Sequence, residues 1–153
     1  MEENVKIYRS FEELDVYKSA GELRKELYRL AKSLPDSEKF NLNLQIRRAV
    51  VSLTNNLADG HGRFHYPDNI RFVLISLGSL EELMDDLNVC EDEAHAASDR
   101  LTLLRAHCTS LLRQLNGYIR YLRDSKAGAS LSLHEEAVPY QVDKSDLGLE
   151  DLA

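Results

Sequence analysis

Residues 45–63 read QIRRAVVSLTNNLADGHGR and have the pattern of an amphipathic helix that ends at two glycines. Apolar side chains recur at steps of three and four residues, which places them along one side of an α-helix. Gly60 and Gly62 follow, and glycine readily adopts the left-handed conformation that ends helices. Extended back by a few residues, the apolar stripe consists of Leu42, Ile46, Ala49, Val50, Leu53 and Leu57. The stretch therefore predicts a helix over about residues 41–59.

Three further segments carry the same spacing. Ser10 and Glu13 have the S-x-x-E form of a capping box, which satisfies exposed backbone amides at a helix start. Pro67 suits the first turn of another helix, because proline lacks the N–H that an interior position would donate. The segments are expected at about residues 11–34, 67–92 and 98–126. Four amphipathic helices with short connectors bury their stripes most simply as an antiparallel up-down-up-down bundle, so the sequence predicts an all-α four-helix bundle.

Composition divides the chain into a bundle over residues 1–126 and an acidic tail over residues 127–153. With 153 residues, 43% of them hydrophobic, the chain is long enough for one domain with a substantial core. Beyond Lys126 the helical periodicity ends. The tail contains the acids Glu135, Glu136, Asp143, Asp146, Glu150 and Asp151. Because it has too little apolar surface to offset the entropy of ordering, a flexible tail is expected.

Charge and cysteine content limit the class of protein. The formal net charge is −7, which argues against a generic polyanion binder, because nonspecific nucleic-acid affinity comes mainly from cationic side chains. Two cysteines are too few for a disulfide-stabilised secreted domain, and the N-terminus lacks the segments of a signal peptide. No apolar run approaches the roughly 18 residues of a membrane span. A soluble, cytoplasmic protein without a membrane partner is expected.

Polar side chains line one edge of the predicted second helix, beside its apolar stripe. At about 100° per residue, four of them fall within a sector of roughly 80°. They are Gln45, Arg48, Ser52 and Asn56. Such a row suits a surface where helices or subunits meet in one register, because each buried polar group requires a partner. The alternative is a partly solvated edge with no special task.

The predicted third helix carries a second row of apolar and small side chains, about 100° from its core stripe. The row consists of Phe72, Ser79, Leu83 and Cys90. A monomer exposing this row would present the contiguous apolar patch that soluble proteins normally hide. We therefore expect these residues at a contact between subunits. The alternative is that the third helix is simply the most buried of the four.

The sequence contains no catalytic motif. The patterns G-x-S-x-G, H-E-x-x-H and G-x-x-x-x-G-K-[ST] are absent. His61 and His65 lie on a glycine-containing connector and lack the spacing and third ligand that zinc needs, so a solvated connector is the preferred interpretation. We expect no enzymatic activity, no cofactor, no metal and no small-molecule substrate.

Other reactive side chains also have structural interpretations. Cys90 and Cys108 flank the connector between the last two helices but lie out of register for a disulfide. Both are interpreted as buried small apolar residues. The neighbouring pairs Glu81–Glu82 and Asp85–Asp86 diverge on a helix surface, unlike converging acid and base groups, and are expected to be solvated.

Arginines on the predicted fourth helix offer the clearest functional feature. Arg105, Arg113, Arg120 and Arg123 fall within about 80° of one another on that helix, and Arg47 adds a basic group on the second helix. Guanidinium groups along one ridge suit a row of phosphates, so these five residues are candidates for nucleic-acid contact. In a ring of subunits the ridge would be repeated, which would strengthen binding. The alternative is that acids of the third helix pair with these arginines.

The second helix resembles the most specific motif of a known family, the bacterial four-helix-bundle proteins encoded within intervening sequences of 23S ribosomal RNA genes. That motif corresponds here to Gln45, Ile46, Arg47, Arg48, Ala49, Ser52, Asn56, Ala58, Gly60 and Arg63. Two further motifs correspond to Gly78, Ser79, Leu80, Glu82 and Leu83, and to Phe11, Leu14, Val16, Tyr17 and Ala20. The resemblance spans roughly residues 11–125. Tyr17 replaces a usual tryptophan, and Thr54 stands where proline is frequent.

The resemblance implies a homo-oligomer, a five-fold barrel of bundles, and a distant kinship with the accessory protein of diversity-generating retroelements. That accessory protein binds nucleic acid and a reverse transcriptase. The family has no established enzymatic activity. The expected function is therefore a non-enzymatic oligomeric bundle that binds RNA or a nucleic-acid complex, with a reverse-transcriptase-like protein as a further candidate partner. The alternative is a homo-oligomeric scaffold that recruits a protein partner without nucleic acid.

Overall fold

The computed structural model describes the backbone of residues 10–63 and 65–133, and the side-chain surroundings of these residues up to Ser125. This part of the chain contains four α-helices and no strand. The helices are α1 (Asp15–Ser33), α2 (Leu42–His61), α3 (Tyr66–Asp92) and α4 (Ser98–Leu133), with short 3₁₀ turns at Phe11–Glu13 and Asp36–Glu38. The predicted all-α fold is confirmed.

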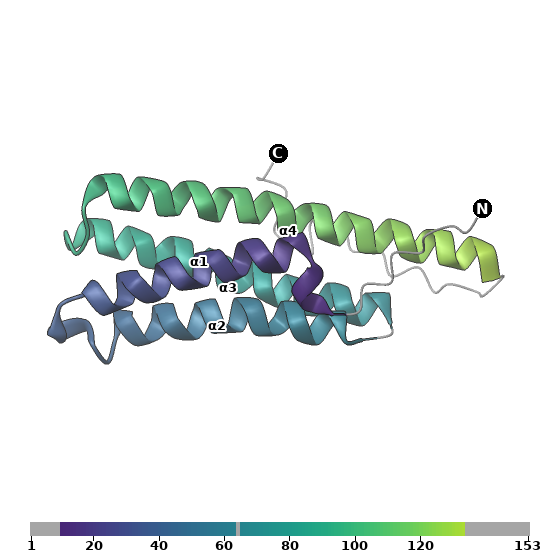
Figure 1. Ribbon diagram of the computed structural model, residues 1–153, viewed down its shortest axis with the longest axis horizontal. Helices are drawn as coiled ribbons and strands as arrows, with labels where there is room; N and C mark the ends of the chain where they lie inside the picture. The colour runs from purple at the N-terminus through teal and green to yellow at the C-terminus, as the bar shows by residue number, and fades with distance from the viewer. Residues whose placement is uncertain (1–9, 64, 134–153) are drawn as a thin grey trace.

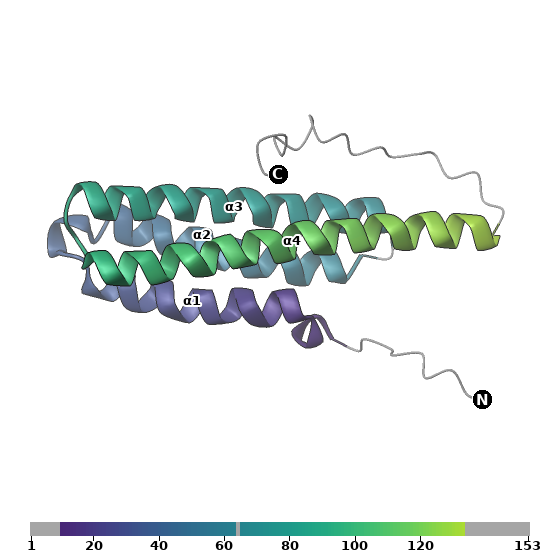
Figure 2. The same ribbon diagram turned by 90° about the horizontal axis from the view of Figure 1, so that it is seen from above.

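The four helices form an antiparallel bundle in which each helix packs against two others (Figures 1 and 2). The order around the bundle is α1, α2, α3 and α4. Near the start of α3, Asn69 Nδ2 donates to Tyr118 Oη at 3.5 Å, whereas near its end Glu91 pairs with Arg105 at 2.6 Å, so α3 and α4 run in opposite directions. This is the up-down-up-down topology that short connectors favour. Among the described helices, none combines the length and the apolar character needed to cross a membrane.

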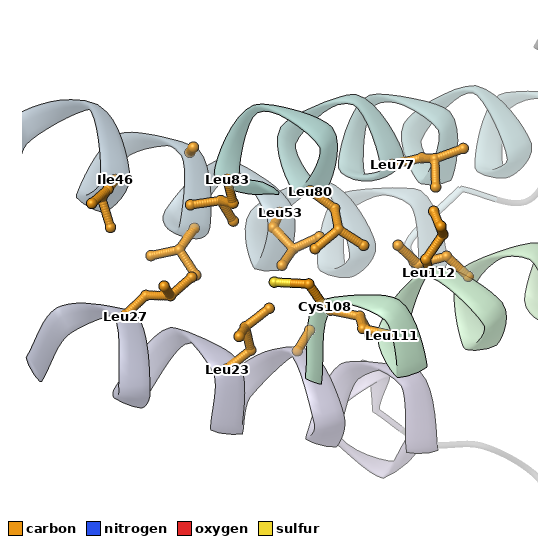
Figure 3. Packing of buried hydrophobic residues seen from close by; sticks show 14 of the residues in the cluster. Leu23, Leu27, Ile46, Leu53, Leu77, Leu80, Leu83, Cys108, Leu111 and Leu112 are labelled. Atoms are coloured by element: carbon orange, nitrogen blue, oxygen red, sulfur yellow. The ribbon is translucent and has the colours of Figure 1, made fainter. Parts of the chain in front are cut away.

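Leucines from all four helices fill the core (Figure 3). Fully buried side chains include Leu23 and Leu27 from α1, Ile46 and Leu53 from α2, Leu80 and Leu83 from α3, and Leu111 and Leu115 from α4. Every member of the apolar stripe predicted for the second helix is buried. Since burying one such side chain stabilises a protein by about 1.5–3 kcal/mol, these stripes hold the bundle together.

The start of the first helix differs from the prediction. Ser10 Oγ accepts a hydrogen bond from the Glu12 N–H at 3.2 Å, so the serine does cap a helical segment. That segment is only a 3₁₀ turn, because Leu14 has extended backbone angles of φ −67° and ψ 128°. The α-helix begins after this break, at Asp15 and not at Phe11.

The end of the fourth helix also differs. The helix continues to Leu133, past Lys126, and in Figure 2 it projects beyond the ends of its neighbours. Apolar periodicity arises where a helix buries one side against other helices. A helix end that has no neighbour to pack against can therefore lack this periodicity and still be helical. The helix end expected at about Lys126 is therefore wrong. Residues 134–153 of the expected tail lie outside the described residues.

Gly60 lies inside α2 and allows α3 to approach closely. Gly62 is the residue that caps this helix, and its φ of −72° shows that it is not left-handed. A Cβ on Gly60 would lie 2.7 Å from Asn69 Oδ1 and 2.8 Å from Phe72 Cβ. The expected left-handed termination is thus wrong, and the absence of a side chain is what Gly60 contributes.

Replacing Gly60 with alanine is expected to lower the free energy of unfolding by roughly 1–2 kcal/mol, because the added methyl group must push α3 away from α2. Urea denaturation would measure this change. Gly21 in α1 provides a matched control, since a Cβ on Gly21 would have no atom within 4 Å. Gly21→Ala should raise stability slightly through helix propensity. A neutral or stabilising effect of Gly60→Ala would contradict the close packing.

Candidate functional site

A polar groove runs along the outer side of α2, and it has one part beside α3 and another part beside Tyr28 of α1. One hollow of about 460 Å³ is lined by Gln45, Arg48, Ala49, Ser52, Glu82, Asp85 and Asp86. A second hollow of about 530 Å³ is lined by Tyr28, Leu44, Arg47, Arg48, Val51, Ser52, Asn55 and Asn56. Because both hollows include Arg48 and Ser52, they adjoin, and we refer to them together as the α2 groove.

Part of the predicted polar row joins α2 to α3 within one chain. Ser79 Oγ donates to Ser52 Oγ at 3.0 Å, and Asn56 Nδ2 donates to the same Ser52 Oγ at 3.1 Å. Deeper in the bundle, Ser76 Oγ donates to the Leu53 carbonyl at 2.8 Å. These bonds fix the register of the two helices. Ser52 and Asn56 therefore have a structural role within the chain.

The rest of that row faces outward. Gln45 is exposed and donates through Nε2 to Asn41 Oδ1 at 3.2 Å, a contact within its own helix start. Arg48 is also exposed, and no residue in the described ranges gives it a hydrogen bond or an ion pair. Arg48 is thus the member of the row that is available to another molecule.

The subunit contact expected from the second row of α3 is wrong for three of its four residues. Ser79, Leu83 and Cys90 are only 7%, 0% and 0% exposed within the single chain. Figure 3 shows Leu83 among the core leucines. The reason is that α3 lies between α2 and α4, which cover it from two sides. Phe72 is half-buried, with the Arg63 guanidinium 4.7 Å above its ring.

Asp86 is the residue of the α2 groove whose environment the sequence did not reveal. The prediction that the acidic pairs are solvated is right for its neighbour Asp85, which is exposed, but Asp86 is only 8% exposed. Burial, reinforced by the charges of Glu82 and Asp85, raises the pKa of Asp86 to about 6. No hydrogen-bond donor or cation among the described residues contacts this carboxylate. Arg48 is the cation among the residues that line the same hollow.

Only some of the arginines that were expected to form a ridge on α4 are exposed and unpaired. Arg105 donates to Asn88 Oδ1 and to Glu91 Oε2, both at 2.6 Å, so the alternative of pairing with α3 holds for this residue. Arg123 is half-buried, and its Nε is buried without a partner. Arg47 on α2 donates through Nε to Asn43 Oδ1 at 2.8 Å.

Arg113 and Arg120 are the free members of the ridge. Both are exposed, and neither has an ion pair or hydrogen bond within the part of the chain that the structure describes. They are seven positions apart, which is close to two helical turns, so they lie on the same side of α4. Two guanidinium groups in this arrangement can contact successive anionic groups.

The family model described as 23S rRNA-intervening sequence protein matches residues 12–117. The chain belongs to this family. No curated protein matches the sequence significantly. In this member of the 23S rRNA-intervening sequence family, the motifs that carried the resemblance meet in space, because Ser52 of α2 contacts Ser79 of α3 and Arg48 shares a hollow with Glu82. Thr54, which stands where proline is frequent, accepts a hydrogen bond from Arg24 Nη1 at 2.9 Å.

The cysteines of this family member are buried thiols. Cys90 and Cys108 are both 0% exposed and free. Burial raises the pKa of Cys108 to about 12 and also raises the pKa of Cys90. A thiolate is therefore disfavoured at neutral pH, which confirms their interpretation as small apolar residues.

His61 ends α2 and His65 precedes α3, and within the described ranges no three potential metal ligands form a group.

Ser19, His107 and Glu26 form an arrangement that sequence reasoning missed. Ser19 Oγ lies 3.4 Å from His107 Nε2, and His107 Nδ1 lies 3.3 Å from Glu26. The order resembles a nucleophile, base and acid. Ser19 is inside α1, however, where the neighbouring N–H groups are used by the helix and cannot stabilise an oxyanion. The three residues therefore serve to link α1 to α4.

Proposed function

We propose that this member of the 23S rRNA-intervening sequence family is a non-enzymatic, homo-oligomeric helical bundle that binds RNA or a nucleic-acid complex. The observation that carries the proposal is the pair Arg113 and Arg120, which are exposed on one side of α4 and free of acidic partners in the described structure. Arginine presents a planar fork of donors that matches a phosphate group. The other three candidate arginines are paired or half-buried, so Arg113 and Arg120 are the proposed phosphate contacts.

Assembly is part of the proposal because one subunit offers only two such contacts and has a net charge of −7. A ring repeats the pair in each subunit, and linked sites bind more tightly than one site alone. The resemblance implies five subunits. The proposed subunit contact lies at the α2 groove, where Arg48 is free, and on the neighbouring surface of α3, where Ile75, seven positions before Glu82, is 51% exposed.

Fluorescence anisotropy with a labelled, structured RNA tests the proposal when the titration is repeated at increasing salt. Because cationic contacts release counterions, the affinity should fall by at least about tenfold between 50 and 200 mM salt. Light scattering on the same sample should give a mass above that of one chain, which is 17.4 kDa. Salt-insensitive binding, or no binding, would contradict a phosphate-directed interaction.

The second candidate function is a homo-oligomeric scaffold that recruits a protein partner, such as a reverse-transcriptase-like protein, without nucleic acid. Exposed apolar side chains favour it: Phe40 is 84% exposed and Ile75 is 51% exposed. Such residues are typical anchors of protein contacts when they lie in a patch. For a scaffold, partner binding should be insensitive to salt and to the state of Arg113 and Arg120.

A further inference from the structure

An exposed tyrosine lies on α4 close to the two free arginines. Tyr121 is 58% exposed, and its ring stacks on that of Tyr118, with centroids 6.3 Å apart and 14° between the planes. Tyr118 is itself half-buried and accepts a hydrogen bond from Asn69 Nδ2 at 3.5 Å. The half-buried ring of Tyr118 therefore supports the exposed ring of Tyr121 on one side. A large aromatic surface held open to solvent is suited to stacking with another planar group.

Gly117 leaves space beside this ring. Helical side chains lean toward the preceding turn, so the Tyr121 side chain extends toward the turn that contains Gly117 and Tyr118. A Cβ on Gly117 would have nothing within 4 Å. Glycine is less favourable than alanine inside a helix, and here no neighbouring atom of the chain requires it. The side of Tyr121 that faces away from Tyr118 is therefore accessible to a flat group that approaches the helix backbone.

Arg113 and Arg120 flank the same space. They stand four positions before and three positions after Gly117, the spacings that place side chains on one side of a helix. Both are exposed. Asp124, also exposed, is the acidic residue on this side of α4, so the two guanidinium groups outweigh it in charge. An aromatic surface with positive charge beside it matches a nucleotide, whose base is planar and whose phosphates are anionic.

We propose that Tyr121, Gly117, Arg113 and Arg120 form a binding site for an unpaired nucleotide of RNA. The base stacks on the open side of the Tyr121 ring above Gly117, and the flanking phosphates contact Arg113 and Arg120. The site rests on the proposed RNA-binding function and specifies which form of RNA is bound. A base within a duplex is already stacked on both faces, so it cannot stack on the Tyr121 ring. The family member is thereby expected to prefer single-stranded segments.

Anisotropy titrations of the full chain with two labelled RNAs test this site. The probes are a single strand of about 20 uridines and a duplex of about the same length. Tyr121→Ala should weaken binding of the single strand by about tenfold and change duplex binding by less than about twofold, whereas Tyr121→Phe should retain binding. Leu103→Ala is the matched control, because Leu103 is a 73% exposed apolar residue of the same helix, and it should leave both affinities unchanged.

Two further variants separate binding from folding. Gly117→Leu places a side chain in the space beside the ring. Because its Cβ would have nothing within 4 Å, the variant should fold normally and lose single-strand binding to the same extent as Tyr121→Ala. The chain contains no tryptophan, so Tyr121→Trp introduces a unique fluorophore. Its emission should be quenched when the uridine strand binds, and the emission of a Leu103→Trp control should not change.

The outcomes distinguish this site from the broader proposal. Unchanged single-strand affinity for Tyr121→Ala, with binding still lost on charge reversal of Arg113 and Arg120, would overturn the stacking site and leave the RNA-binding function standing. An equal loss for strand and duplex, or a Tyr121→Trp variant whose emission is not quenched on binding, would also overturn the stacking site. Failure of the unaltered protein to bind either RNA would overturn both proposals.

Discussion

Replacing Arg113 and Arg120 together with glutamate is expected to weaken RNA binding by about 100-fold, the largest effect on binding that we predict. Each substitution removes a phosphate contact and introduces a repelling charge, and a loss of about tenfold per site is within the range for such contacts. In an assembly the loss recurs in every subunit, so the measured effect can exceed this value. Anisotropy at low salt would measure the affinities. The salt dependence of the remaining binding should also become weaker.

Arg29→Glu with Lys32→Glu is the control for this charge reversal. Both residues are exposed on α1, and their replacement changes the net charge by the same amount. A uniform electrostatic effect would reduce affinity equally in the two variants, whereas a local phosphate site predicts a loss of less than about threefold in the control. Circular dichroism and light scattering should show an unchanged fold and mass for both. Equal losses would contradict the assignment of Arg113 and Arg120.

The sequence predicts the bundle well because apolar periodicity is a direct consequence of burial. The stripe of α2 and the start of α3 near Pro67 follow from spacing and from the chemistry of proline, which are local properties. The end of α4 at Leu133 and the role of Gly60 depend on where neighbouring helices are present or absent. A single sequence does not contain that information in its local pattern.

The candidate site could be predicted only in part, for a related reason. Arg113 and Arg120 follow from their helical position alone, but the pairing of Arg105 with Glu91 depends on the contact between α3 and α4. The small and apolar row of α3 is equally compatible with a second subunit and with α2 of the same chain. Leu83 is covered by its own chain, because α3 is flanked on both sides. Burial on a helix can be read from periodicity, but the identity of the covering element cannot.

Asp86→Asn is expected to raise the free energy of unfolding by about 2 kcal/mol at pH 7.5 and to have almost no effect near pH 4. The ordinary pKa of an aspartate is 3.8 and that of Asp86 in the folded chain is about 6, so the folded protein retains a proton that the unfolded chain has already released. Stability contributed by this proton is therefore fully present below pH 3.8 and is lost as the pH rises to about 6. The difference between the two pKa values corresponds to about 3 kcal/mol of stability. The asparagine amide of the variant is buried without a hydrogen-bond partner, which has its own cost, so the expected gain is smaller than this value.

Urea denaturation of both proteins across this pH range would measure the effect, and Asp85→Asn is the matched control because Asp85 is the exposed neighbour. The control should change stability by less than about 0.5 kcal/mol at either pH, since a solvated carboxylate has little to gain from neutralisation. A loss of stability for Asp86→Asn at pH 7.5 would contradict an uncompensated carboxylate. It would mean that a cation neutralises Asp86, either Arg48 from across the same hollow or a basic residue of a second copy docked in the α2 groove. If the cation is Arg48, Arg48→Gln should lower stability with the same pH dependence, and if it is a residue of a second copy, Arg48→Gln should not.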